Sequence, residues 1–301
     1  MITRRNFLRN SLLTGAGLSL SNAQLFAQLL GQEKPYKMTL LRNNVGYFTE
    51  RGGTIGYFID EEGIAVVDTQ FPEQSQHLIE EIQKQSLRKF DLLINTHHHG
   101  DHTSGNIAYK GIVNNVVAHE NSKRNQMRVA EENKRADSQL YPETTFSKEW
   151  SGKVGKETIS LKYFGAAHTD GDALVHFENA NIVHTGDLVF NRRYPYIDKS
   201  AGANIKSWIQ VLENAQKIYD NDTMFIFGHS DNGFDVIGKK SDINAFQNYL
   251  SRLLDTVDVA IKSGKSEEEV MKITEIIGAE EWKGDGISRS LSAAYTELSK
   301  E

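Results

Sequence analysis

The residues of this chain best suited to chemistry lie in one short stretch, residues 96–105. Within six positions it holds four side chains that can bind a metal ion: His97, His99, Asp101 and His102. An apolar run at 90–95 precedes them and has the length of a buried strand. Alternate residues of an extended chain share a face, so His97 and His99 point the same way. Gly100 allows a sharp turn, which brings Asp101 and His102 towards a second ion. Imidazole mixed with carboxylate suits zinc, manganese or iron better than calcium.

The alternative is a histidine-rich surface loop that binds metal by accident. The strand before the stretch argues against it, and so do three further candidates downstream. Each of these stands where an apolar run ends in glycine-rich sequence, within residues 163–172, 182–187 and 225–229: His168, Asp187 and His229. Ligands at the carboxyl ends of strands are typical of α/β active sites. The chain therefore offers seven candidate metal ligands, five histidines and two aspartates.

Composition narrows the class of protein. The chain is 39% hydrophobic and 25% charged, as expected of a soluble globular protein, and its formal net charge of -6 disfavours nucleic acid as a partner. It has no cysteine, which excludes disulfides and thiolate ligands and leaves oxygen and nitrogen to bind metal. No apolar run of membrane-spanning length follows the N-terminal segment. A small-molecule substrate is the expectation, and the sequence indicates no oligomeric state.

Residues 1–30 are predicted to be a twin-arginine-type signal peptide and a short linker. Arg4 and Arg5 are followed by Phe7 and Leu8, then by a moderately apolar stretch and small residues at 21–23. The alternative is an amphipathic N-terminal helix of the mature protein. Export predicts a periplasmic or secreted protein with no stable membrane anchor after the signal is removed. Because twin-arginine export moves folded proteins, the metal would be inserted in the cytoplasm.

The remaining sequence alternates between strand and helix patterns, which indicates an α/β fold. Residues 120–150 are expected to start as a helix and then become irregular, as a lid over the site or as a solvated excursion. Strands are expected at 53–60, 64–68, 90–96, 116–118, 157–164, 173–178, 181–190 and 224–227, and helices at 74–85, 205–219, 239–262 and in the last forty residues.

The series His97-x-His99-x-Asp101-His102, then His168, Asp187 and His229, resembles the metallo-β-lactamase superfamily of metal-dependent hydrolases. The resemblance covers nearly the whole chain after about Asn43. It implies a four-layer αββα sandwich of two mixed β-sheets with helices outside. The site would lie at one edge, between the sheets. Residues 31–301 are accordingly expected to form a single hydrolase domain.

The resemblance also implies a role for each residue. His97, His99 and His168 would bind one metal ion, Asp101, His102 and His229 a second, and Asp187 would bridge the two. Two Zn²⁺ per chain are expected, with iron or manganese as alternatives. A metal-bridging hydroxide would attack the substrate's carbonyl or phosphoryl centre, and the catalytic residue Asp101 would orient it. Asp68 is either an outer partner of a ligand imidazole or a cap at its strand end.

Several chemistries remain open within this family. The expected function is exported hydrolysis of an amide, lactam, lactone or ester, with β-lactamase activity as one case. A thioesterase of glyoxalase II type, an iron-dependent sulfur dioxygenase and a non-catalytic metal carrier are the alternatives. Asp187 stands where many lactamases of this fold have Cys or Ser, and Phe190 where some have a substrate-binding Lys. Arg192 or Arg193 would hold a substrate carboxylate or lie in a solvated turn. The other histidines are expected in the core or on the surface: His77, His98, His119, His176 and His184.

Overall fold

The computed structural model describes residues 34–299, and the predicted signal peptide lies outside them. Residues Met38–Glu301 form one compact unit, whose architecture is given below. Within the described residues, every helix is too short or too polar to cross a membrane.

The first β-sheet has seven strands in sequence order, and the candidate ligands of residues 97–102 follow its strand β5. β2 to β4 run antiparallel and β4 to β7 parallel, so the sheet is mixed. Its strands are β1 (Lys37–Arg42), β2 (Val45–Thr49), β3 (Ile55–Ile59), β4 (Ile64–Val67), β5 (Leu92–Asn95), β6 (Val116–His119) and β7 (Thr144–Phe146).

The second sheet has six strands in the order β15-β13-β11-β10-β9-β8, and it is also mixed because β11 and β13 are parallel. Beside it, β12 (Phe190–Asn191) and β14 (His229–Ser230) form a small parallel pair. The six strands are β8 (Glu149–Val154), β9 (Glu157–Lys162), β10 (Leu174–Phe177), β11 (Ile182–His184), β13 (Met224–Ile226) and β15 (Ile237–Gly238).

The two sheets enclose an apolar layer built from alternate residues of their strands. In β5, Leu92 and Ile94 belong to this layer, and in β9 Ile159 and Leu161 do. Leu93, between the first pair, is equally buried and belongs to the outer face of its strand. Strands covered on both faces read as continuous apolar runs, which is why the sequence marks them so clearly.

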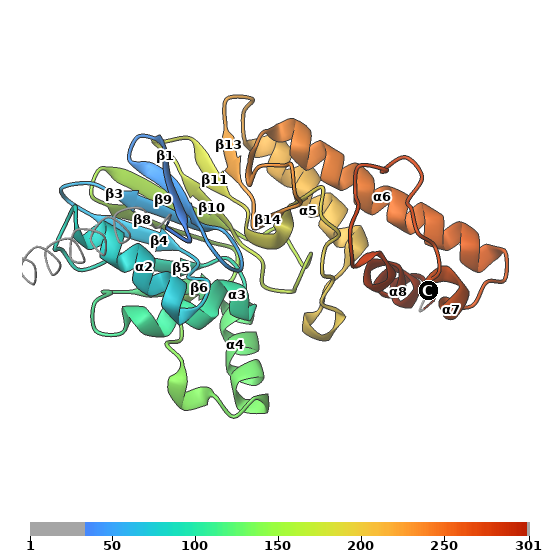
Figure 1. Cartoon of the computed structure of the whole chain (residues 1–301), viewed down its shortest axis with the longest axis horizontal. Coiled ribbons are helices and arrows are strands. Elements are labelled where there is room, and N and C mark those ends of the chain that lie inside the picture. Colours follow the sequence, from blue (N-terminus) through green and yellow to red (C-terminus); the bar gives the residue numbers. More distant parts are fainter. Residues whose placement is uncertain (1–33, 300–301) are drawn as a thin grey trace, which may run out of the picture. The chain divides into compact units, whose positions relative to one another are not determined.

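Helices cover the outer faces of the sheets (Figure 1). α2 (Pro72–Gln83) and α4 (Glu120–Glu132) lie with the first sheet, and α4 contacts β6 and β7. A second apolar cluster joins α5 (Ile205–Ile218), α6 (Lys240–Lys262) and α8 (Ile287–Leu298) to the second sheet. The short helices are α3 (Gly100–Thr103) and α7 (Glu267–Val270). Two mixed sheets flanked by helices confirm the predicted α/β sandwich.

Local sequence explains where α5 begins and which face it buries. The side chain of Asn204 accepts a hydrogen bond from the backbone N–H of Ser207, which caps the first turn. Trp208, Val211 and Leu212 follow at spacings of three and four residues and are buried. The apolar stripe therefore faces the second sheet.

Two predictions of secondary structure were wrong. Residues 144–150, expected to be irregular, belong to β7 and β8, whose buried residues are Phe146 and Val154. Their polar sequence hides the strand pattern, and as sheet strands they are neither a lid nor a solvated excursion. The strand expected over 181–190 ends at His184, because the chain enters a 3₁₀ turn at Gly186, whose φ is +51°. That turn presents Asp187.

We expect Phe246→Ala to destabilise the protein by about 3–5 kcal/mol. Phe246 is fully buried in α6, with its ring centroid 5.4 Å from that of Trp208 and 5.9 Å from that of Tyr249. The measurement is the free energy of unfolding from urea titration. Val259→Ala on the same helix is the control, since Val259 is 67% exposed and should change stability by no more than about 0.5 kcal/mol. Equal unfolding midpoints for the two variants would contradict the packing described here.

Candidate metal centre

Three of the seven predicted ligands meet directly after strand ends. His99 Nδ1 lies 3.1 Å from His97 Nε2 and 2.9 Å from His168 Nε2. His97 and His99 follow β5, and His168 lies in the loop between β9 and β10. With Asp187 they form a first cluster, in which one ligand atom from each residue lies within 4.8 Å of all the others. His97 and His168 are fully buried.

A second cluster consists of Asp101, His102 and His229. Asp101 Oδ2 lies 3.1 Å from His229 Nε2 and 3.8 Å from His102 Nε2, and the two imidazole nitrogens are 3.4 Å apart. Helix α3 begins at Gly100 and so turns Asp101 and His102 away from the direction of β5. The family resemblance predicted that these three residues bind one ion, and the structure brings them together.

Asp187 lies between the two clusters, and each of its carboxylate oxygens faces a different one. Oδ2 is 3.4 Å from His168 Nε2 and 3.8 Å from His97 Nε2. Oδ1 is 3.0 Å from His102 Nε2 and 3.5 Å from His229 Nε2. The Oδ1 atom is buried, and no protein hydrogen bond satisfies it.

These distances fit two metal ions that share Asp187. Ligand atoms bound tetrahedrally to zinc at 2.0–2.1 Å lie about 3.3 Å from one another. The separations given above, from 2.9 to 3.8 Å, scatter around that value. An orphaned carboxylate oxygen aimed at imidazole nitrogens is what a bridging ligand requires. The donor atoms are nitrogen and oxygen without sulfur, a set that suits zinc, manganese or iron.

Asp68 holds the second cluster from behind. Its Oδ2 lies 2.7 Å from His102 Nδ1. The same carboxylate accepts hydrogen bonds from the backbone N–H of Thr96 at 2.8 Å and from its hydroxyl at 2.7 Å. Asp68 therefore has both predicted roles: it is an outer partner of the His102 imidazole, and it ties the ends of two strands together. A carboxylate behind a histidine fixes the ring's tautomer, so His102 presents Nε2 to the cluster.

Sequence reasoning missed the corresponding partners of the first cluster. Asp198 Oδ2 lies 2.9 Å from His99 Nε2, and the backbone carbonyl of Tyr196 lies 2.6 Å from His168 Nδ1. The Asp198 contact joins residues 99 positions apart, so no local pattern could reveal it. The ring of Tyr196, 47% exposed, lies beside the first cluster with its centroid 5.5 Å from that of His99.

Burial and charge shift the pKa values of the histidines in opposite directions, down for two in the first cluster and up for the two in the second. Burial and the neighbouring imidazoles hold the pKa of His97 well below its usual range, and burial lowers the pKa of His168 to about 3. Burial acts in the same sense on His102 and His229, but the carboxylates outweigh it and raise the pKa of both, Asp187 most strongly. His97 and His168 are therefore neutral imidazoles ready to bind metal, whereas protons compete with metal for His102 and His229.

Two glycines make room for the site. A Cβ atom on Gly228 would come within 2.0 Å of Asp187 Oδ1, and one on Gly53 within 2.1 Å of the His102 ring. Both contacts are far shorter than van der Waals distance, so any side chain there would displace a candidate ligand. Gly228, directly before His229, therefore lets the backbone pass close to Asp187.

The other five histidines lie outside the two clusters, as expected. His98 is buried on the far side of His99, with Nε2 3.6 Å from Asp198 Oδ2. His184 is buried and contacts the carbonyl of Thr54 at 3.0 Å. Of the remaining three, His119 caps α4, His176 lies in β10 and His77 pairs with Glu50.

The loop after Asp187 offers less to a substrate than its sequence suggests. The Phe190 ring stacks on that of His229 at 5.5 Å and is only 4% exposed. Arg192 is neither solvated nor free for a substrate, because its guanidinium pairs with Asp242 at 3.0 Å and Glu281 at 3.1 Å. Arg192 fits neither reading, because its side chain ties the loop to the C-terminal part of the chain, whereas Arg193 is exposed and both readings stay open for it.

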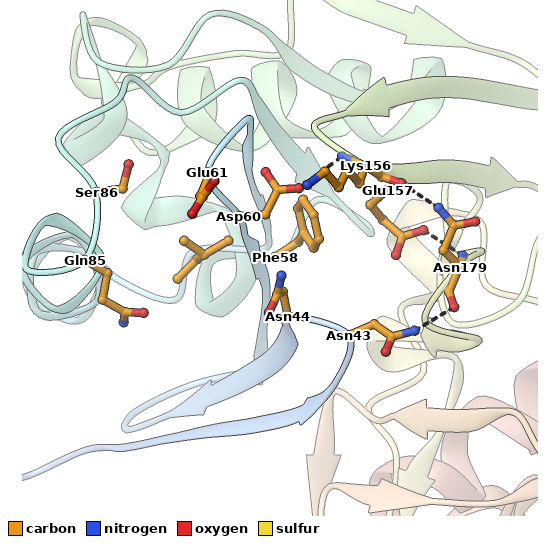
Figure 2. A pocket seen from close by; sticks show the side chains of 11 residues that line it. Asn43, Asn44, Phe58, Asp60, Glu61, Gln85, Ser86, Lys156, Glu157 and Asn179 are labelled. Carbon is orange, nitrogen blue, oxygen red and sulfur yellow. Dashed lines mark hydrogen bonds between the residues drawn. The ribbon is translucent and has the colours of Figure 1, made fainter.

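A polar cavity of about 830 Å³ lies at the other end of β3 from the clusters. Figure 2 shows Asp60, Lys156, Glu157 and Asn179 on its wall. Asp60 accepts a hydrogen bond from the backbone of Lys156 at 3.0 Å, and Glu157 from that of Asn179 at 2.7 Å. These bonds join hairpin turns, and no predicted ligand lines the cavity, so it is separate from the metal centre.

Comparison with known proteins agrees with this geometry. The family model described as the metallo-beta-lactamase superfamily matches residues 49–229. The chain is 24% identical over 231 residues to a metallo-beta-lactamase type 2 of Elizabethkingia meningoseptica, an alignment covering 73% of this chain and 87% of that protein. It is also 24% identical to one of Bacillus cereus, over 64% of this chain and 76% of that protein.

Solved structures share the fold. A metallo-beta-lactamase from Pontibacter korlensis superposes with a TM-score of 0.58 at 21% identity, over 72% of this chain and 99% of that one. The sec-alkyl sulfatase PisA1 gives a TM-score of 0.67 at 12% identity, over 87% of this chain and 50% of that one. With the matched family model and the two His/Asp clusters, these likenesses lead to one conclusion: the chain belongs to the metallo-beta-lactamase superfamily and is a metal-dependent hydrolase of that fold.

Proposed function

We propose that the protein is an exported hydrolase that uses two zinc ions to open an amide, lactam, lactone or ester. One observation carries the proposal: the two oxygens of Asp187 face two separate groups of ligand atoms. A single-ion site would need only one of these groups. Export is inferred from the twin-arginine pattern at residues 3–9 and supports a periplasmic or secreted location.

Ions in these clusters would supply a Lewis acid for the carbonyl oxygen and lower the pKa of a bound water to about 7. The side chain of Asp101 is 32% exposed, against 5% for Asp187. Its carboxylate can therefore reach substrate or water while Oδ2 stays beside His229. We assign Asp101 the task of orienting the water and accepting its proton.

The residues around the clusters, and the relatives of the chain, indicate which classes of substrate are candidates. Lactams are candidates because the relatives at 24% identity carry the name metallo-beta-lactamase type 2. Position 190 holds a phenylalanine and Arg192 is paired with acidic residues, so neither binds a substrate carboxylate, and lactones, esters and thioesters are candidates as well. The exposed ring of Tyr196 beside His99 favours a substrate with an apolar part next to its carbonyl.

An iron-dependent sulfur dioxygenase is the alternative in another reaction class. It would hold one iron with two histidines and one aspartate. The second cluster has that composition by itself, but the first cluster is equally well formed. Metal identity and number separate the two functions.

We expect close to two zinc ions per chain by mass spectrometry, and about one or fewer after Asp187→Asn. The amide would offer one oxygen and no charge between two dications, so the shared ligand would be lost. His176→Gln is the matched control, because His176 lies in β10 outside both clusters. Two zinc ions retained by Asp187→Asn, or a single iron in the native chain, would contradict the dinuclear assignment.

Zinc is expected to leave the second cluster first as the pH falls. Carboxylates raise the pKa of His102 and His229, so protons displace metal there at a higher pH than at His97 and His168, where burial lowers the pKa. Zinc content after dialysis at decreasing pH should fall from two to a plateau near one, then to zero. Release of both ions in one step would show that the clusters do not differ in this way.

Asp101→Ala is expected to reduce kcat/KM by about 10²–10⁴-fold, the usual contribution of a positioned acid–base group. The substrate is the lactam, lactone, ester or thioester that the native enzyme turns over fastest in a screen. Zinc content is measured on the same samples, so that metal loss is separated from loss of proton transfer. Full activity in the variant would rule out the role given to Asp101.

A further inference from the structure

One short segment, residues 194–199, contacts two imidazoles of the first cluster. The carbonyl of Tyr196 can only accept, so His168 must donate from Nδ1 and turn Nε2 towards the cluster. The Asp198 carboxylate likewise accepts from His99 Nε2, which leaves His99 Nδ1 facing His168. The segment thus sets the tautomers of both rings.

The segment is held in turn by the C-terminal part of the chain. Three hydrogen bonds join them: Tyr194 Oη to the carbonyl of Trp282 at 2.7 Å, Ser290 Oγ to the carbonyl of Pro195 at 3.1 Å, and Lys199 Nζ to Glu297 Oε2 at 2.8 Å. Ser290 and Glu297 both lie on α8, and both are buried. Buried polar contacts hold geometry more firmly than exposed ones, since breaking them strands a polar group.

Glu297 also reaches the start of α5. Its carboxylate accepts hydrogen bonds from the backbone N–H groups of Ile205 at 2.8 Å and Lys206 at 3.0 Å. Asn204, which caps that helix, donates its own N–H to the carbonyl of the residue before His168 at 3.0 Å. One side chain of α8 is therefore connected to the first cluster by two routes.

α8 lies outside the residues that the family model matches, 49–229. We propose that α8 is a positioning element of the metal centre: through Ser290 and Glu297 it fixes the 194–199 segment, and the segment fixes His99 and His168 for the first ion. The inference rests on the proposed metal-dependent function. It assigns Ser290, Glu297 and Asp198 as positioning residues that contact neither ion nor substrate.

α8 supplies its own control for a test. Ser290 and Ser292 lie two positions apart, and each hydroxyl donates one hydrogen bond. Ser290 bonds to Pro195 in the segment, whereas Ser292 bonds to Glu267 in α7 at 2.6 Å. Ser290→Ala and Ser292→Ala therefore remove the same chemical group from the same helix, and only the first change affects the segment.

The experiment measures zinc affinity of the full chain by competition with a chelator, and the visible spectrum of the cobalt(II)-loaded protein. Outer hydrogen-bond partners of metal-binding histidines are worth roughly 10–100-fold in affinity. We expect Asp198→Asn to lower the affinity for the first zinc ion by a factor in that range. Ser290→Ala and Glu297→Gln should each lower that affinity by about tenfold and alter the cobalt absorption bands. Ser292→Ala should leave both readouts as in the native chain. Equal effects of the two serine variants would overturn the proposal.

A double variant tests the route from α8 to the cluster. If Glu297 acts through Asp198, the combined loss of zinc affinity in Glu297→Gln with Asp198→Asn is smaller than the product of the single losses. Multiplicative losses would mean that Glu297 acts through the start of α5 and not through the 194–199 segment, which would refute the role proposed for Glu297. Thermal unfolding of each variant identifies any that fail to fold. If the native protein binds two zinc ions and all α8 variants bind them equally well, only this inference is refuted. If the native protein binds no metal, the proposed function itself is refuted.

Discussion

The structure depends on one buried carboxylate. Asp187 is 4% exposed and has imidazole nitrogens of four histidines within 3.8 Å. A carboxylate buried without compensation costs several kcal/mol, so the surrounding groups must supply positive charge. Protons on His102 and His229 can do this, as their raised pKa values indicate, and metal ions can do it more strongly. The glycine at 228, the turn at Gly186 and the strand ends from both sheets all serve to place ligands around that charge.

Because Asp187 belongs to one sheet and His97 to the other, the site exists only when the sheets are packed. Asp187 follows β11, and His97 follows β5. The apolar layer that brings these strands face to face includes Ile182 and Ile94, a few residues before each ligand. Folding and metal binding must therefore stabilise each other, since binding free energy gained at the edge of the sandwich adds to the stability of its core.

The sequence revealed the parts of this arrangement that local patterns encode. Apolar runs ending in His or Asp beside glycine marked the strand ends, and the fold then brought the seven candidate ligands together at one edge. Contacts over long sequence distances stayed hidden, such as Asp198 with His99 and Arg192 with Asp242. Weakly apolar strands were missed too, because β8 (Glu149–Val154) has only one buried residue, Val154. Its pairing with β9, not its own pattern, makes it a strand.

The surroundings of the two clusters differ in charge, and this asymmetry divides the chemistry. The first cluster offers three imidazoles and a share of Asp187, with one outer carboxylate, Asp198. The second offers two imidazoles, Asp101 and the other share of Asp187, with Asp68 behind His102. Under the proposed assignment the first ion keeps more of its positive charge and is the stronger Lewis acid for a carbonyl oxygen. The second lies in the more anionic surroundings, beside the exposed carboxylate of Asp101 that can move a proton. Under this assignment, polarisation of the substrate and handling of the water would belong to opposite sides of Asp187.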